Sequence, residues 1–370
     1  MPFAVDCGIR ATPIDPLRPR PSYARPRRKR GENMRHRTRA ALVALAASLL
    51  AAPAVRAEVS EVTIAQQYGV SFLPLMLMER EGLLEKRAKA AGLPDVKVNW
   101  AKVAGPSVMN DGLLSGTMHF VAQGAPSLIT LWDKTRGSVG VKGVAAMTTY
   151  PLYLVTRNPE VKSLKDFSTK DKIAIPSVKI STQAIMLQMA AAATWGEGEY
   201  ARLDPLTVSL SHPDAMVAFL NQSGGINAHF ATSPFYEQEM KAVPGARVIT
   251  TNYEILGGPA TAIVLTTTSK FREANPKVYK AFFDALSESI DAVNKDKRAA
   301  AKLYLEMARD NKNSVEDILA IIEDKDYRYT LKPEKVFKTA QFMAKIGSIK
   351  QAPKSLEEMF FPEAANLGGD

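Results

Sequence analysis

Hydrophobic and polar positions along residues 60–270 follow two alternating patterns. Short apolar runs, typical of buried strands, are each followed by a longer stretch with helical spacing. The apolar runs predict strands at 62–66, 96–100, 119–123, 144–148, 152–156, 172–175, 206–210, 226–231, 247–250 and 261–266. The stretches between them predict helices at 72–81, 107–115, 126–134, 182–194, 214–221 and 234–240. Alternation of this kind predicts an α/β fold with a mostly parallel sheet.

The pattern beyond residue 270 is helical. Asn275 and Pro276 are typical N-cap and first-turn residues, and they predict a helix at 276–294. Further helices are predicted at 296–308, 314–323 and 333–346. Helices therefore follow the α/β part of the chain.

The α/β pattern starts near residue 60 and starts again after residue 163. Two extended segments, 152–156 and 261–266, are placed to carry the chain from one part to the other and back. We therefore predict a first lobe formed by 58–151 and 262–370 and a second lobe formed by 152–261. The carboxyl ends of strands in such sheets face a crevice that binds ligands, so the ligand site is expected in a cleft between the lobes.

A signal peptide is predicted at residues 34–57. Arg35, Arg37 and Arg39 precede an apolar run at 40–52, which is followed by small residues up to Ala57. The run of about 13 residues is shorter than the roughly 18 that span a bilayer, so a permanent membrane anchor is the weaker interpretation. We expect cleavage near Ala57 and a periplasmic protein. Residues 1–33 are predicted to be either disordered or a mis-assigned extension ahead of the true start.

The leader also accounts for the charge of the chain. The net charge of +10 would suggest nucleic acid or an anionic membrane as a partner. The first 57 residues carry 12 of the 48 Lys and Arg and three of the 38 Asp and Glu, so the remainder is near +1. No nucleic-acid partner is therefore expected. The single cysteine, Cys7, lies in this segment too, so the predicted mature chain has neither a thiolate nucleophile nor a cysteine metal site.

Loops that follow the predicted strands carry the candidate ligand-binding residues. These residues are mostly uncharged hydrogen-bonding groups, and several precede a helix whose free N–H groups favour an anion. The candidates are Gln67, Tyr68, Gly69, Gln123, Gly124, Ala125, Ser177, Lys179, Ser181, Thr182, Gln183, His212 and Ser233. Each has a structural alternative: Ser181 and Thr182 as helix caps, Tyr68 as a packing residue, Lys179 as a solvated cation and His212 as a turn cap.

Four segments in order resemble periplasmic solute-binding proteins of ABC importers, of the nitrate/taurine/alkanesulfonate type. They are Gln66 to Ser71 with Glu81-Gly82-Leu83, Leu114 to Phe120, Leu164-Lys165-Asp166 before Ile173 to Ser177, and Pro213-Asp214-Ala215 through Ala228 to Ser233-Pro234. The resemblance covers nearly all of residues 60–350. It implies a two-lobed periplasmic-binding-protein fold of type II and a monomer. It also implies a small-molecule ligand, and an inner-membrane ABC permease with its ATPase as partners.

Two positions depart from the family pattern, which usually has Asp at His119 and Asp-Ala at Asn227-Ala228. We interpret them as structural variation that leaves the ligand open. A sulfonate, nitrate or carboxylate is expected, with a pyrimidine-type thiamine precursor or a role as a periplasmic sensor partner as the alternatives. No P-loop, nucleophile elbow, zinc-protease or dinucleotide motif is present. The sequence therefore predicts a binding protein with no catalytic residue, cofactor or metal.

Overall fold

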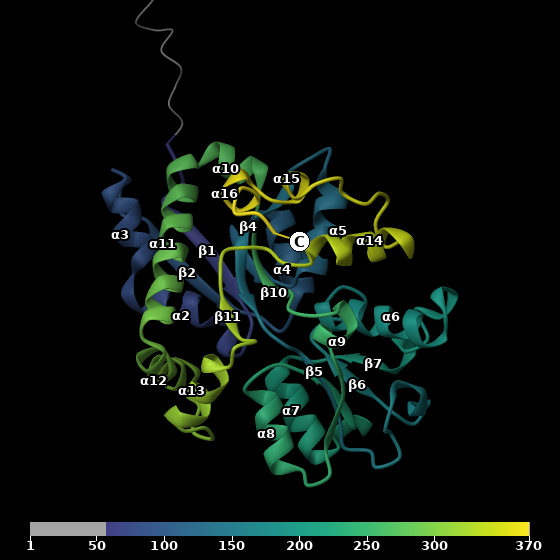
Figure 1. Cartoon of the computed structure of the whole chain (residues 1–370). Helices are drawn as coiled ribbons and strands as arrows, with labels where there is room; N and C mark the ends of the chain where they lie inside the picture. The colour runs from purple at the N-terminus through teal and green to yellow at the C-terminus, as the bar shows by residue number, and fades with distance from the viewer. Residues whose placement is uncertain (1–56, 370) are drawn as a thin grey trace, which may run out of the picture. The chain divides into compact units, whose positions relative to one another are not determined.

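The computed structural model describes residues 57–369, which form one compact unit. This unit is built on two β-sheets with helices on their faces (Figure 1). The first sheet has the strand order β11-β4-β10-β3-β1-β2, with β1 Glu61–Gln66, β2 Lys97–Lys102, β3 Phe120–Gln123, β4 Val141–Thr149, β10 Thr261–Thr268 and β11 Arg328–Tyr329. The second has the order β7-β6-β8-β5-β9, with β5 Tyr153–Thr156, β6 Ile173–Ile175, β7 Thr207–Ser209, β8 Ala228–Ala231 and β9 Arg247–Thr251.

Both sheets are mixed, so the prediction of a mostly parallel sheet is wrong. Strand β1 pairs in parallel with β2 and β3, but β10 runs antiparallel to β3 and β4. In the second sheet β6 is parallel to β7 and β8, whereas β5 is antiparallel to β8 and β9. The two strands that run against their neighbours, β5 and β10, are those that carry the chain from one sheet to the other: β5 comes directly after β4, and β10 comes after β9 and the short helix α9.

The helices of the described residues cover both faces of the first sheet and flank the second. They are α2 Leu73–Glu81, α3 Leu83–Ala90, α4 Pro106–Ser115, α5 Ala125–Thr135, α6 Thr182–Trp195, α7 His212–Asn221, α8 Phe235–Ala242, α9 Asn252–Leu256, α10 Ser269–Ala274, α11 Pro276–Lys295, α12 Lys297–Ala308, α13 Val315–Glu323, α14 Val336–Lys345, α15 Leu356–Met359 and α16 Pro362–Ala365. None of the helices in residues 57–369 is both long and apolar enough to cross a membrane.

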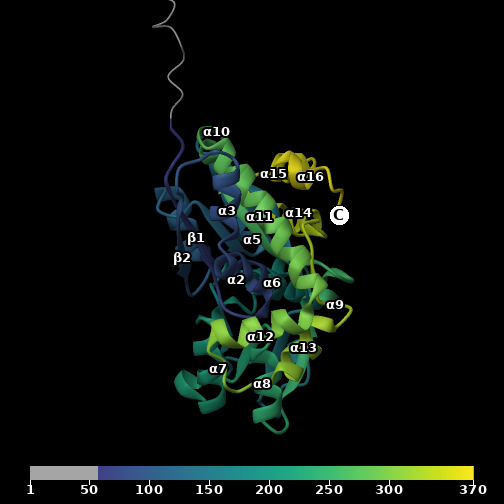
Figure 2. The same cartoon turned by 90° about the vertical axis from the view of Figure 1, so that its left-hand side faces the viewer.

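Helix α11 shows how the pattern of residues builds the core of the first sheet. Val278, Phe282, Ala285 and Val293 recur at helical spacing and are buried. Phe282 stacks on Phe120 of β3, with ring centroids 3.8 Å apart. The same helix packs along α2 and α3, as Figure 2 shows. This packing covers the first sheet at the start of β3.

Five short helices were absent from the sequence-based prediction, namely α3, α9, α10, α15 and α16. The signal for α9 is a capping box, in which Thr251 Oγ1 accepts from the Glu254 N–H and the Glu254 carboxylate accepts from the Thr251 N–H. Asn275 is the N-cap residue of α11 and Pro276 is its first residue, as predicted. The Asn275 side chain makes no capping bond to α11, and its Oδ1 accepts from the Val59 N–H at 2.9 Å.

Candidate functional site

The candidate site is a small cleft bordered by loops that follow strands of both sheets. Its lining contains no Lys, Arg, Asp or Glu from the described residues. The lining residues are Gln67, Tyr68, Phe72, Pro106, Gly124, Tyr150, Leu152, Pro176, Ser181, Thr182, Gln183, His212, Thr232, Ala262 and Ile263. The space within it is about 20 Å³ in this structure, which is close to what one water needs.

Four helices begin at the cleft. Pro106 is the first residue of α4, Gly124 is the N-cap of α5, Ser181 is the N-cap of α6 and His212 is the first residue of α7. The first N–H groups of a helix have no partner within it, and the helix dipole adds a partial positive charge there. Four such ends around uncharged side chains therefore favour a negatively charged guest.

The two sides of the cleft touch directly at Gly124 and Thr182. A Cβ atom placed on Gly124 would lie 2.1 Å from Thr182 Oγ1, so only glycine allows this approach. Beside it, Ser107 Oγ donates a hydrogen bond to Ser177 Oγ at 3.0 Å. The cleft is therefore closed along this side.

A second contact closes the cleft near Gly69. The φ of Gly69 is 119°, a conformation that L-residues rarely adopt, and a Cβ there would lie 2.9 Å from the Ser233 carbonyl oxygen. The N–H of Val70 approaches the same oxygen at 3.4 Å. A glycine is therefore needed at residue 69 both for its φ and for its contact with Ser233.

A chain of buried side chains runs from the cleft into the second sheet. Gln183 Nε2 lies 3.3 Å from His212 Nε2, His212 Nδ1 lies 2.9 Å from His229 Nε2, and His229 Nδ1 lies 2.6 Å from Glu239 Oε1. An amide nitrogen can only donate, so each residue of the chain donates to the next, and both histidines carry their proton on Nδ1. The Oε1 and the second N–H of the Gln183 amide make no bond to His212, so they can bind a ligand in the cleft.

Burial keeps these hydrogen-bonded side chains uncharged. It lowers the pKa of His229 to about 3. It also holds the pKa of His212 well below the usual value, and the neighbouring His229 lowers that pKa further. Burial also raises the pKa of Glu239 well above the usual value. Gln183 is therefore held in place by neutral groups, and no charge from this chain reaches the cleft.

Several buried polar atoms near the cleft have no hydrogen-bond partner among the described residues. They include both side-chain polar atoms of Gln66 and Gln123, at the ends of β1 and β3, and the hydroxyl oxygens of Thr182 and Thr232. Buried polar atoms usually have a partner, and one without a partner costs about 1–3 kcal/mol. Thr182 and Thr232 line the cleft, so their hydroxyl groups are suited to a polar guest.

The structure brings seven of the predicted site residues together in the cleft lining: Gln67, Tyr68, Gly124, Ser181, Thr182, Gln183 and His212. Gly69 lines an adjoining surface pocket, Ser233 lines a separate cavity, and Ser177 bonds to Ser107 at the edge of the cleft. Gln123 and Ala125 are buried next to Gly124. Lys179 is exposed and does not line the cleft. Ser181 also caps α6, because its Oγ accepts from the Ala184 N–H at 3.2 Å.

Other lining residues were not among the predicted ones. Pro106 follows β2 and opens α4, so the rule that selected the loops after other strands would have selected it too. Tyr150, Thr232 and Ile263 come from segments far apart in the chain, and no local pattern marks them. His119 has a hydrogen-bond partner within the first sheet, since its Nδ1 accepts from the Thr63 N–H at 2.9 Å. In residues 57–369, no group of three or more His, Cys, Asp or Glu side chains is placed to hold a metal ion.

Comparison with known proteins gives matches among solved structures only. No protein-family model matches the chain, and no curated protein matches it. The alkanesulfonate-binding protein SsuA from Xanthomonas axonopodis pv. citri, bound to MOPS, has a TM-score of 0.61 and 18% sequence identity, over 80% of this chain and 96% of that one.

Two further structures support the same fold. The periplasmic nitrate-binding protein NrtA from Synechocystis PCC 6803 has a TM-score of 0.59 and 15% identity, over 82% of this chain and 84% of that one. The CA3427 gene product of Candida albicans, described as having the generic periplasmic binding protein fold, has a TM-score of 0.58 and 16% identity, over 84% of this chain and 99% of that one. The chain therefore has the periplasmic-binding-protein fold, and the predicted α/β class and the predicted resemblance are confirmed at the level of fold.

Proposed function

We propose that this chain is the substrate-binding component of an ABC importer and captures a small organic anion, such as a sulfonate, taurine, nitrate or a carboxylate. The ligand would be delivered in the periplasm to an inner-membrane permease and its ATPase, with no bond made or broken. Residues 58–151 with 262–370 would form one lobe and 152–261 the other. The observation that carries the proposal is the meeting of four helix N-termini at a cleft without charged side chains.

The energetics of the cleft agree with an anionic ligand of moderate affinity. Hydrogen bonds to a charged group contribute about 1.5–3 kcal/mol each. Ser181, Thr182 and Gln183 offer donors at the start of α6, and Gln67 offers another from the opposite side. Three or four such bonds approach the roughly 8 kcal/mol of a micromolar complex before ordering costs are subtracted.

Entry of a ligand requires the two sides of the cleft to separate, because the space of about 20 Å³ is smaller than any of these anions. The contacts that would have to part are Gly124 with Thr182, Ser107 with Ser177, and Val70 with Ser233. A ligand that bridges the same two sides would stabilise the closed arrangement, which is the physical basis of hinge closure.

One observation favours a second candidate ligand. The rings of Tyr68, Phe72 and Tyr150 line the cleft together with the amides of Gln67 and Gln183. Aromatic faces and amide groups suit a flat heteroaromatic compound, which stacks on the rings and pairs its edge with the amides. A pyrimidine-type thiamine precursor therefore remains the alternative ligand.

A thermal-shift screen of the purified protein tests both ligands. The panel contains nitrate, taurine, a short alkanesulfonate, acetate and an aminopyrimidine. We expect an anion to raise the melting temperature, and the Ser181→Ala/Thr182→Ala double variant to lose that shift. Stabilisation by the aminopyrimidine alone would support the alternative, and an anion shift that survives in the double variant would refute the proposed anion site.

A further inference from the structure

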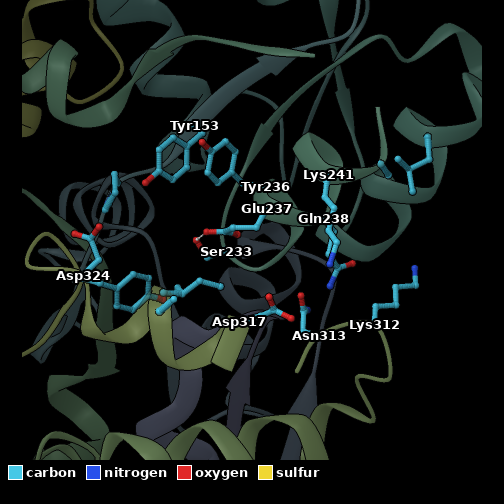
Figure 3. Close-up of a pocket in the computed structure, with 16 residues that line it drawn as sticks. Tyr153, Ser233, Tyr236, Glu237, Gln238, Lys241, Lys312, Asn313, Asp317 and Asp324 are labelled. Atoms are coloured by element: carbon cyan, nitrogen blue, oxygen red, sulfur yellow. Dashed lines mark hydrogen bonds between the residues drawn. The ribbon is translucent and has the colours of Figure 1, made fainter. Parts of the chain in front are cut away.

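A second and larger cavity lies on the other side of a tyrosine pair from the cleft. It has a volume of about 710 Å³ and is lined by residues of β5, α8 and α13 (Figure 3). No residue lines both the cavity and the cleft. Tyr150 lines the cleft and Tyr327 lines the cavity, and their rings stack with centroids 5.0 Å apart. The volume is within the range of about 300–1,000 Å³ that is typical of small-molecule sites.

One wall of this cavity is aromatic. Tyr153 of β5 and Tyr236 of α8 stack face to face, with centroids 3.8 Å apart and an interplanar angle of 11°. Both side chains are only partly buried, and both line the cavity (Figure 3). The face of a tyrosine ring attracts a cation that lies within about 6 Å of it.

A carboxyl group with an incomplete set of partners lies beside these rings. Glu237 Oε1 accepts a hydrogen bond from Ser233 Oγ at 2.7 Å, whereas its Oε2 is out of contact with water and has no hydrogen-bond partner. No Lys or Arg of the described residues forms an ion pair with Glu237. Burial raises the pKa of Glu237 to about 7. Glu237 lines the cavity, so a cation there would pair with this carboxylate once the side chain turns Oε2 toward it.

Three carboxyl groups and two lysines line the cavity. In Figure 3, Glu237 and Asp324 lie on the side of Tyr153, Lys241 and Lys312 lie on the other side, and Asp317 lies between Glu237 and Lys312. The acidic groups of the lining outnumber the basic ones, which favours a cation over an anion in the cavity.

We propose that the cavity is a second ligand site, which takes a small organic cation with a primary ammonium group and an apolar or aromatic body. The ammonium group lies against Glu237 and donates to its carboxylate, and the body lies on the ring of Tyr153 or Tyr236. The proposal does not depend on the ligand of the cleft, because the two sites share no lining residue.

Titration calorimetry of the purified protein with benzylamine and its uncharged analogue benzyl alcohol tests the proposal. We expect benzylamine to bind at least tenfold more tightly than benzyl alcohol. Glu237→Gln is expected to weaken benzylamine binding at least tenfold and to leave benzyl alcohol binding unchanged. Tyr236→Leu, a second variant at a partly exposed position, is expected to weaken benzylamine binding about fivefold.

Two control variants locate the binding. Glu160→Gln removes the same charge from an exposed loop and is expected to leave benzylamine affinity unchanged. Ser181→Ala/Thr182→Ala alters the cleft and is also expected to leave it unchanged. Absence of benzylamine binding, equal affinity for the two compounds, or wild-type affinity in folded Glu237→Gln and Tyr236→Leu proteins would overturn the proposal. A loss of benzylamine affinity in the cleft variant would place the amine in the cleft and would overturn it as well.

Discussion

Gly124 and Thr182 lie in direct contact across the cleft, one at the N-terminus of α5 and the other at the N-terminus of α6. The backbone of Gly124 therefore meets the side-chain hydroxyl group of Thr182 at the two helix ends. Helix α5 follows β3 of the first sheet, and α6 follows β6 of the second. The contact between Gly124 and Thr182 therefore depends on how closely the two sides of the cleft approach each other. The contact also offers a way to test closure without changing any polar group of the cleft.

Gly124→Ala is expected to weaken binding of the cleft ligand at least tenfold. The added Cβ would lie 2.1 Å from Thr182 Oγ1, so the closed state must shift. A strain of about 1.4 kcal/mol in the closed state alone gives a tenfold loss of affinity. Little change in the fold is expected, since the φ of −69° and ψ of 149° at Gly124 suit alanine. Calorimetry with the anion found in the screen measures the effect.

The matched control for this substitution is Gly137→Ala. A Cβ on Gly137 meets no atom within 4 Å, so this substitution adds the same methyl group without a contact. It is expected to leave affinity unchanged. Wild-type affinity in Gly124→Ala would show that ligand binding does not require the contact between Gly124 and Thr182.

Ser181→Ala and Ser314→Ala separate the role of Ser181 as a cap from its role in binding. Ser181 Oγ accepts from the Ala184 N–H at the start of α6, and Ser314 Oγ accepts from the Asp317 N–H at the start of α13. Loss of either cap is expected to lower the free energy of unfolding by about 1 kcal/mol. Only Ser181→Ala is expected to lower anion affinity as well, because Ser314 is outside the cleft lining. Urea unfolding and calorimetry measure the two effects, and equal affinities in the two variants would reduce Ser181 to a cap.

The order of strands and helices was predictable because each element carries its own local signal. We predicted a strand at 62–66 and helices that end at Gly82 and Gly116. They are present as β1, α2 and α4. Both glycines adopt the left-handed conformation that ends a helix, with φ of 58° and 76°. Strand direction was not predictable in the same way, since the antiparallel pairing of β10 with β3 depends on partners more than a hundred residues apart.

The candidate site was partly predictable for a similar reason. Ser181 and Gly124 follow a strand and precede a helix, and this order is visible in the sequence. The chain from Gln183 to Glu239 was not predictable, because it depends on α7 beginning at His212, two residues before the predicted start. That start places the His212 ring against His229 of β8, and no periodicity indicates that Glu239 of α8 lies beside it.

Glu239→Gln and Glu239→Leu test whether the row of hydrogen-bonded side chains from Gln183 to Glu239 is uncharged. Burial raises the pKa of Glu239, so glutamine resembles its protonated form and can still accept from His229 Nδ1. We expect Glu239→Gln to change the free energy of unfolding near pH 7 by less than about 1 kcal/mol. Leucine leaves a buried N–H of His229 without a partner, which costs about 1–3 kcal/mol. Urea unfolding measures both variants. Equal destabilisation by glutamine and leucine would indicate that the carboxylate is ionised in the folded protein.

Glu237 is expected to make the stability of the folded protein depend on pH. Its pKa rises from 4.5 to about 7 on folding, because burial disfavours the ionised form. Below pH 4.5 the group is protonated in both states and has no effect. As the pH rises through the range from 4.5 to about 7, the unfolded chain loses the proton first, so the folded state loses stability. A pKa shift of this size lowers the free energy of unfolding by about 3 kcal/mol at pH values above about 7.

Glu237→Gln removes this dependence, because glutamine does not titrate and can still accept the hydrogen bond from Ser233. The free energy of unfolding of the variant minus that of the wild type is expected to rise with pH and to level off above about pH 7. Urea unfolding at a series of pH values gives the difference directly. A difference for Glu237→Gln that does not change with pH would mean that Glu237 ionises at the usual pKa of a carboxyl group. The cavity beside Tyr153 would then hold a carboxylate that needs no further partner, which would weaken the case for a cation there.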